Sequence, residues 1–381
     1  MNHPALAIAQ KLIRFPSITP ADAGAQDYLK SLLRPLGFEI FDLEFSGRDS
    51  YKVRNFFARR GKGGPHLCFA GHTDVVPPGD EAAWSVPPFA GDVRDGRLFG
   101  RGSSDMKGQI AAFIAALEAF LTAHGGAEGY SISLLITGDE EKDSINGTAR
   151  VLEWMEENGH IPDVCLVGEP SNPDYIGQEI KIGRRGSLTG RLTVRGVQGH
   201  VAYPDRADNP LPRLIRYLDA LQNHIFDKGS AWFPPTNLEV TTIDVGNPST
   251  NVIPATGRAT FNLRYADRWT KEALENKIRV ILDEISPDYE IAFTRGAEAF
   301  LTQPGEWTAL VAKAVETVTG SKPAATTGGG TSDARFFAQY CPVVECGMVN
   351  KSIHQVDEYC TMEELQTCTA IYREILKLYC A

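Results

Sequence analysis

Two histidines and five acidic residues of this sequence follow short apolar runs or stand just before a helical pattern. They are His72, Asp74, Asp105, Glu140, Glu141, Glu169 and His354. Neutral imidazole nitrogens and carboxylate oxygens are ligands for zinc or a similar divalent ion, and such a site needs no thiolate. Two ions that share one bridging carboxylate would each take one histidine, one further carboxylate and the bridge. This scheme uses five of the seven residues and leaves two for supporting roles.

Each of these residues also has a purely structural interpretation. A single histidine usually lies on the surface or is hydrogen-bonded in a core, and the acidic run at 139–141 could be a solvated loop. Asp105 could cap the helix that follows it, and Glu169 could belong to a turn before Pro170. The shared position of the seven residues favours a metal site, but the residue types alone leave both interpretations open.

Short apolar runs bounded by glycine and proline predict the buried strands of a parallel sheet. These runs cover residues 66–70, 131–137, 163–167 and 342–344. Apolar residues spaced three and four apart predict a helix over 107–121. Strands that alternate with helices indicate an α/β domain with a mostly parallel, mixed sheet flanked by helices. Ligands bind outside the carboxyl ends of the strands in such sheets, and the seven residues fall at those ends.

The stretch from about 185 to 297 has a different pattern. Strands with alternating polarity and two helical patterns follow one another in the order β-α-β-β-α-β, the split unit of ferredoxin-like folds. We therefore predict an α+β domain over 185–297, inserted into a catalytic domain formed by 1–184 and 298–381. An exposed outer strand of this insertion would need covering, and pairing with another subunit is one solution.

Composition limits the possible partners and locations of the protein. The chain has 381 residues and a formal net charge of −10, whereas a protein that binds nucleic acid normally has a basic face. No apolar run approaches the roughly 20 residues that cross a bilayer, and the first residues do not read as a signal peptide. The seven cysteines include no C-x-x-C pair, which argues against a disulfide scaffold. We expect a cytoplasmic protein that binds neither nucleic acid nor membranes.

Seven short motifs and a late histidine occur in order along the chain. They are GHTDVVP (71–77), GRGSSDMKGQ (100–109), TGDEE (137–141), VGEP (167–170), GVQGHVAYP (196–204), NVIP (251–254), GGGTSDARF (328–336) and His354. Together they resemble the co-catalytic zinc deacylase and peptidase family, and the resemblance spans nearly the whole chain. It implies that the inserted domain is a lid through which the protein forms a homodimer. It also implies two Zn²⁺ ions per subunit, which Co²⁺ could replace.

The resemblance also implies a ligand set for the two ions. By it, one zinc is held by His72 and Glu169, and the other by Glu141 and His354. Asp105 bridges the two ions.

Three further residues have implied roles in the reaction. Asp74 matches the carboxylate that orients the imidazole of His72. Glu140 matches the general acid/base that works with a metal-activated water on an amide bond. His200 matches a histidine that reaches the active site of the other subunit and binds the developing oxyanion. The choice of Glu140 as the acid/base and Glu141 as the ligand rests on the resemblance, not on their spacing.

Within the family, GRRGS (183–187), the stretch after His200 and GTSDARF are most similar to enzymes that act on an anionic small molecule, N-succinyl-LL-2,6-diaminopimelate. The expected reaction releases succinate and LL-2,6-diaminopimelate for lysine biosynthesis. Arginine pairs with carboxylates in a bidentate manner, although the arginines could instead form ion pairs between domains. The implied substrate contacts are Arg184, Ser187, Tyr203, Asn251, Arg264, Gly330, Thr331 and Asn350.

Two alternatives remain at this point. The same metal chemistry would serve an acetylornithine deacetylase or a dizinc peptidase, which differ in the substrate pocket. A binding protein without catalytic activity could also be built on this fold. The presence of Glu140 together with all five ligand positions argues against a binding protein.

Overall fold

The computed structural model describes residues 3–47, 50–124, 129–294 and 296–380. The chain forms two compact units. The first comprises residues 1–182, 302–326 and 332–381, and the second comprises 183–301 and 327–331. The predicted insertion at 185–297 lies within the second unit. The loop at 327–331 also belongs to the second unit, whereas the sequence pattern assigns it to the catalytic domain.

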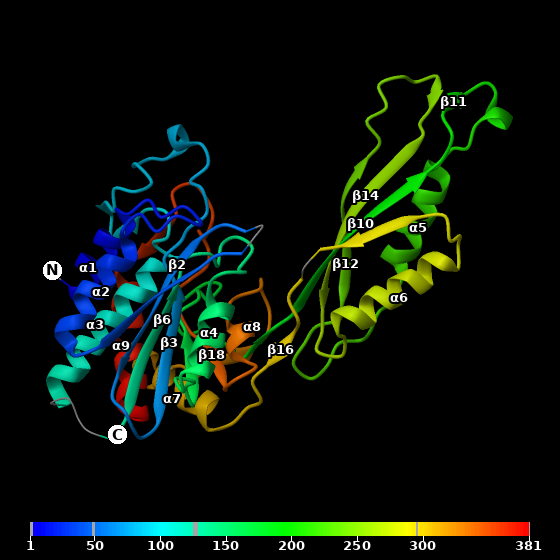
Figure 1. The fold of residues 1–381 in the computed structure, drawn as a ribbon. Helices are drawn as coiled ribbons and strands as arrows, with labels where there is room; N and C mark the ends of the chain where they lie inside the picture. The colour runs from blue at the N-terminus through cyan, green and yellow to red at the C-terminus, as the bar shows by residue number, and fades with distance from the viewer. Residues whose placement is uncertain (1–2, 48–49, 125–128, 295, 381) are drawn as a thin grey trace. The chain divides into compact units, whose positions relative to one another are not determined.

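An eight-stranded mixed sheet forms the centre of the first unit (Figure 1). The order of its strands is β1-β2-β6-β3-β7-β18-β8-β17. Their bounds are β1 Glu39–Phe45, β2 Val53–Arg60, β3 His66–His72, β6 Ser131–Thr137, β7 Val164–Val167, β8 Glu179–Lys181, β17 Ala324–Thr326 and β18 Val343–Glu345. The neighbours β6, β3, β7 and β18 run parallel to one another. The predicted α/β class with a mostly parallel sheet is therefore confirmed.

Helices cover both faces of this sheet (Figure 1). Their bounds are α1 Pro4–Ile13, α2 Ala25–Leu33, α3 Lys107–His124, α4 Thr148–Glu157, α7 Glu306–Thr319, α8 Ala334–Phe337 and α9 Met362–Tyr379. Helix α3 packs against α1, α9 and β3. The ring of Phe69 on β3 stacks on Phe113 of α3 at 4.0 Å between centroids, and Tyr372 of α9 meets both rings edge-on. This aromatic contact holds β3 against the helix that follows Asp105.

A small antiparallel sheet of the first unit joins two distant segments. It contains β4 (Val93–Arg94), β5 (Arg97–Phe99) and β19 (Tyr359–Thr361). Tyr359 pairs with Phe99, so the chain just after the predicted ligand His354 runs beside the chain just before Asp105.

The second unit has the predicted β-α-β-β-α-β order. Its elements are β10 (Gly186–Arg195), α5 (Leu211–Asn223), β12 (Asn237–Asp244), β14 (Thr256–Tyr265), α6 (Lys271–Asp283) and β15 (Glu290–Phe293). The sheet order β12-β14-β10-β15 is antiparallel throughout. Alternate residues of the strands, such as Leu188, Leu192 and Leu263, form one core with apolar residues of α5 and α6. Two short pairings complete this unit: β9 (Gly183–Arg184) with β16 (Phe300–Leu301), and β11 (Gly199–His200) with β13 (Val252–Ile253).

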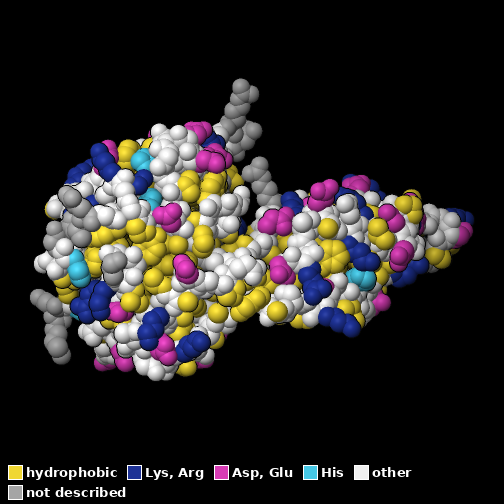
Figure 2. Space-filling view, turned by 90° about the horizontal axis from the view of Figure 1, so that it is seen from below, with side chains coloured by type: hydrophobic (Ala, Val, Ile, Leu, Met, Phe, Trp, Pro, Cys, Tyr) yellow, Lys and Arg dark blue, Asp and Glu magenta, His cyan; other side chains and the backbone are white. Residues whose placement is uncertain are grey.

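Three further features concern the helices, the cysteines and the surface charge. None of the described helices is both long enough and apolar enough to cross a membrane. All seven cysteines are free thiols. Figure 2 shows basic and acidic side chains interspersed among the described residues on the face drawn there.

Candidate metal centre

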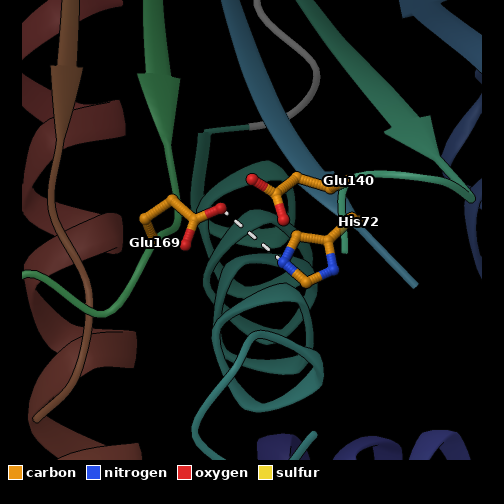
Figure 3. A group of neighbouring side chains, drawn as sticks. All are labelled: His72, Glu140 and Glu169. Carbon is orange, nitrogen blue, oxygen red and sulfur yellow. Dashed lines mark ion pairs between the residues drawn. The ribbon is translucent and has the colours of Figure 1, made fainter. Parts of the chain in front are cut away.

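The ends of three parallel strands bring the predicted ligands together. His72 is the last residue of β3 and pairs in register with Thr137, the last residue of β6. Glu140 and Glu141 follow β6, and Glu169 follows β7. Because β6, β3 and β7 run parallel, their carboxyl ends meet at one edge of the sheet. Figure 3 shows the carboxylates of Glu140 and Glu169 directed at the imidazole of His72.

The imidazole of His72 is buried and faces acidic groups on both sides. Its Nε2 lies 3.3 Å from Asp105 Oδ1 and 3.6 Å from Glu169 Oε1. Its Nδ1 lies 2.9 Å from the main-chain oxygen of Asp74 and 3.7 Å from the carboxylate of that residue. The sequence predicts that the carboxylate of Asp74 orients His72. In the structure, it is the main-chain oxygen of Asp74 that lies at hydrogen-bonding distance from the imidazole.

The carboxylate of Asp74 instead holds the chain after β6. It is fully buried and accepts the backbone N–H groups of Glu140 and Glu141 at 3.3 and 3.1 Å. Two such bonds fix the direction in which this acidic pair leaves the strand. The role of Asp74 in the geometry is to position the acids as well as to adjoin the imidazole.

The second histidine faces the other side of Asp105. His354 Nε2 lies 3.1 Å from Glu141 Oε1 and 3.5 Å from Asp105 Oδ2. The two oxygens of Asp105 thus face two different histidines. The backbone of His354 has a φ of 62°, a left-handed conformation that is uncommon outside glycine. A carboxylate that has one oxygen towards each of two histidines could contact two metal ions.

Charges within the cluster shift the acid–base properties of its members. Burial lowers the pKa of His72, but Asp105, Glu169 and Glu140 outweigh it and raise that pKa well above its ordinary value. Contacts with Asp105 and Glu141 raise the pKa of His354 to about 10. Burial, followed by the charge of Glu169, raises the pKa of Glu140 well above its usual range. A concentration of carboxylates that binds protons this strongly also favours cations.

The donor set fits divalent metal ions. His72 Nε2 and Asp105 Oδ1 are buried and form no hydrogen bond with any described residue, although unsatisfied buried polar atoms are costly. Ligand atoms of His72, Asp105 and Glu141 lie within 4.8 Å of one another, and so do those of His72, Glu140 and Glu169. The geometry alone therefore admits either glutamate of the pair as a ligand. The contact of Glu141 with His354 favours Glu141 as the ligand on that side.

The predicted substrate contacts are divided between the two units. Asn350 lies in the first unit and is half-buried. Arg184, on β9 in the second unit, is buried and donates to the carbonyl of Gly328 at 3.3 Å. The remaining predicted contacts in the second unit are Ser187, Tyr203, Asn251, Arg264, Gly330 and Thr331.

Several of these residues are neighbours within the second unit. Ser187 on β10 is the cross-strand partner of Arg264 on β14. His200 on β11 is exposed, and its ring lies 5.6 Å from that of Tyr203 between centroids. The backbone N–H of Val201 donates to the carbonyl of Asn251 at 3.0 Å. These five predicted residues therefore form two groups in this unit, one on the main strands and one around β11 and β13.

Sequence reasoning missed two charged residues that adjoin the site. Arg101 and Glu358 are both almost fully buried and form an ion pair of 2.7 Å. Arg101 lies in the motif GRGSSDMKGQ (100–109). Its burial could not be predicted there, because arginine is usually exposed. Glu358 stands outside every motif, so only its burial identifies it.

Similarity to known proteins defines the family. The model of Peptidase family M20/M25/M40 matches residues 68–378, and the chain belongs to this family. The chain is 54% identical, over 99% of its length and 97% of the other protein, to a succinyl-diaminopimelate desuccinylase of Rhodospirillum centenum. It is 50% identical, over 100% and 99% of the two lengths, to a protein of the same name from Methylocella silvestris.

Solved structures show the same fold at low sequence identity. An M20 family metallo-carboxypeptidase from Sulfolobus solfataricus superposes with a TM-score of 0.82 at 17% identity, over 99% of each chain. The YxeP protein of Bacillus subtilis, a dinuclear metal-binding peptidase, gives a TM-score of 0.70 at 16% identity, over 98% of this chain and 96% of the other. The protein is a metal-dependent amide hydrolase by its family membership and its similarity to the desuccinylases, and the imidazole and carboxylate groups at its sheet edge could hold a metal ion.

Proposed function

We propose that this enzyme hydrolyses N-succinyl-LL-2,6-diaminopimelate to succinate and LL-2,6-diaminopimelate, a step of lysine and diaminopimelate biosynthesis. The proposal rests on sequence similarity. The chain is 50–54% identical, over 99–100% of its length, to relatives named succinyl-diaminopimelate desuccinylase. The cluster of imidazole and carboxylate groups at the sheet edge supplies the chemistry that such a reaction needs.

We assign the metal ions as two zinc ions, which cobalt could replace. His72 and Glu169 would hold one ion, His354 and Glu141 the other, and Asp105 would contact both. Two bound divalent ions lower the pKa of a shared water and polarise the substrate carbonyl. The mixture of imidazole nitrogens and carboxylate oxygens supports this assignment because both are ligands of zinc and of similar ions.

Glu140 is the proton carrier in this proposal. Its carboxylate points towards the ring of His72 (Figure 3) and is held at the base by the bond from its backbone N–H to Asp74. It takes a proton from the attacking water, whose oxygen forms a bond to the amide carbon. It then donates a proton to the nitrogen as the carbon–nitrogen bond breaks.

Substrate recognition falls to the arginines and polar groups of the second unit and to Asn350. The substrate carries three carboxylates, and planar guanidinium groups pair with carboxylates through two parallel hydrogen bonds. Arg184 and Arg264 are the cations of this set, and the pKa of Arg264 is lowered by burial. A guanidinium that is already partly desolvated pairs strongly with an incoming anion.

We further propose that the enzyme is a cytoplasmic homodimer through the second unit. The exposed imidazole of His200 would hydrogen-bond the developing oxyanion in the active site of the other subunit. Its position on a short two-stranded ribbon, beside Tyr203, supports this because both side chains are exposed.

The paired variants Glu140→Gln and Glu141→Gln test the proposal. We expect Glu140→Gln to retain both metal ions while kcat falls about 10²–10⁴-fold, because only the proton carrier is lost. Glu141→Gln should lose part of its bound metal. For both variants, elemental analysis measures the metal content, and turnover of the succinylated substrate measures kcat. Faster turnover of N-acetylornithine than of the succinylated substrate by the unmodified enzyme would refute the proposed specificity.

A further inference from the structure

A buried ion pair adjoins the candidate metal centre. It forms hydrogen bonds with the loop after His72, with the segment of Asp105 and with the segment of His354. The guanidinium of Arg101 is 2% exposed and the carboxylate of Glu358 is 0% exposed. Arg101 Nη1 donates to Glu358 Oε2 at 2.7 Å. Burying two charges is costly, and the cost is offset only when further hydrogen bonds satisfy both groups.

Glu358 supplies those bonds to the segment that carries Asp105. Its Oε1 accepts the backbone N–H groups of Ser104 and Asp105 at 3.0 and 3.1 Å. Its main-chain oxygen accepts the N–H of Gly100 at 2.9 Å. One carboxylate therefore fixes the backbone of Asp105 and of the residue before it.

Arg101 supplies the remaining bonds to two other segments. Its Nη1 donates to the carbonyl of Gln355 at 3.1 Å, and its Nη2 donates to those of His354 and Pro77 at 3.4 Å each. Pro77 lies in the loop that follows His72 and continues to Asp80. The face of the guanidinium lies 5.3 Å from the ring of Trp84, which covers it. One side chain thus connects the loops of both histidines.

We propose that Arg101 and Glu358 are positioning residues for the metal centre, an inference that rests on the proposed function for its catalytic consequence only. The pair holds the backbones of Asp105 and His354 so that each oxygen of Asp105 faces one histidine. It also supports the left-handed backbone of His354, whose carbonyl it binds. The hydrogen bonds of the pair reach the backbones of Asp105 and His354 and not their side chains, so the pair acts through these two residues.

The variant Glu358→Gln tests this inference through metal affinity. The amide places an NH₂ group opposite either the guanidinium or the two backbone donors, so one set of bonds is lost. We expect the apparent dissociation constant of the more weakly held zinc ion to rise about 10–100-fold. Zinc competition against a chromogenic chelator measures this constant, and elemental analysis after dialysis against buffered zinc counts the ions. In turnover assays at saturating zinc, kcat should fall while KM changes little.

Asp22→Asn is the matched control. Asp22 is also buried, accepts two backbone N–H groups from Gly24 and Gln26 at 3.0 Å each, and pairs with a guanidinium, that of Arg54, at 3.1 Å. It contacts none of the proposed ligands. We expect this variant to lose thermal stability as Glu358→Gln does, but to keep the zinc affinity of the unmodified enzyme.

A second variant covers the case in which Glu358→Gln does not fold. Arg101→Lys keeps a cation beside Glu358, but the lysine cannot reach all three carbonyls. We expect its zinc dissociation constant to rise, by a smaller factor than in Glu358→Gln. Unchanged affinity for both ions in the folded variants, or an equal loss in Asp22→Asn, would overturn the inference. If the unmodified enzyme failed to cleave the succinylated substrate while the zinc constants shifted as expected, the proposed function would fail and the positioning role would stand.

Discussion

His66, the first residue of β3, makes the stability of the first unit depend on pH. The side chain is 4% exposed, and its Nε2 lies 2.7 Å from Ser133 Oγ on β6. Burial, followed by the charge of Arg59, lowers the pKa of His66 from 6.5 to about 4. The folded protein therefore keeps this imidazole neutral at a pH at which the unfolded chain protonates it. Because β3 ends at His72, loss of this strand would also dismantle the metal centre.

The sign and size of the effect follow from the two pKa values. Stability rises with pH wherever the unfolded state binds more protons, which here is between about 6.5 and 4. The contribution of His66 is thus complete above pH 6.5 and is lost as the pH falls. At about pH 5 the loss is about 2 kcal/mol, since each pKa unit corresponds to about 1.4 kcal/mol.

The comparison of the unmodified protein with His66→Gln isolates this contribution. Glutamine does not titrate but keeps a polar group near Ser133. Urea unfolding followed by far-ultraviolet circular dichroism, in the same zinc buffer at each pH, gives the two stability curves. We expect the unmodified protein to lose about 2 kcal/mol more than the variant between about pH 7.5 and 5. Titration of His160 and metal release are common to both proteins, so parallel curves would refute the reasoning.

Three further outcomes are expected. Glu141→Ala should lower the zinc content measured by elemental analysis from two ions towards one per chain, because it removes the carboxylate 3.1 Å from His354; retention of both ions would contradict its role as a ligand. His200→Ala should lower kcat about 10²–10³-fold with unchanged zinc content, and an unaltered kcat would remove it from the mechanism. Arg184→Lys should raise KM for the succinylated substrate more than it lowers kcat, because lysine cannot form the bidentate pair; initial-rate kinetics measure both constants, and an unchanged KM would count against substrate contact.

Local patterns were sufficient to predict much of the fold. The strand at 131–137 has the bounds that its apolar run predicts, and the helix predicted over 107–121 continues to His124. The extra turn has no apolar periodicity to mark it. The order of elements in the second unit was also readable, since alternating and helical spacings of apolar residues are properties of neighbouring residues.

The geometry of the metal centre could be predicted only in part. The sequence places acids and a histidine after parallel strands, and parallel strands bring their carboxyl ends together at one edge. It could not show that the backbone oxygen of Asp74 approaches His72 at 2.9 Å while its carboxylate binds the N–H groups of the acidic pair. Such bonds depend on the turn that each loop adopts after its strand.

The sequence by itself determined which residue types lie at the carboxyl ends of the parallel strands, because hydrophobic periodicity and strand ends are local properties of the chain. Only the tertiary structure decided that Asp105 stands between His72 and His354, with one oxygen towards each. These residues are far apart in the chain, and their alignment is fixed by the packing of β3 against α3 and by the buried Arg101–Glu358 pair. Both contacts form only when distant segments are folded together and water is excluded, so no local pattern encodes them.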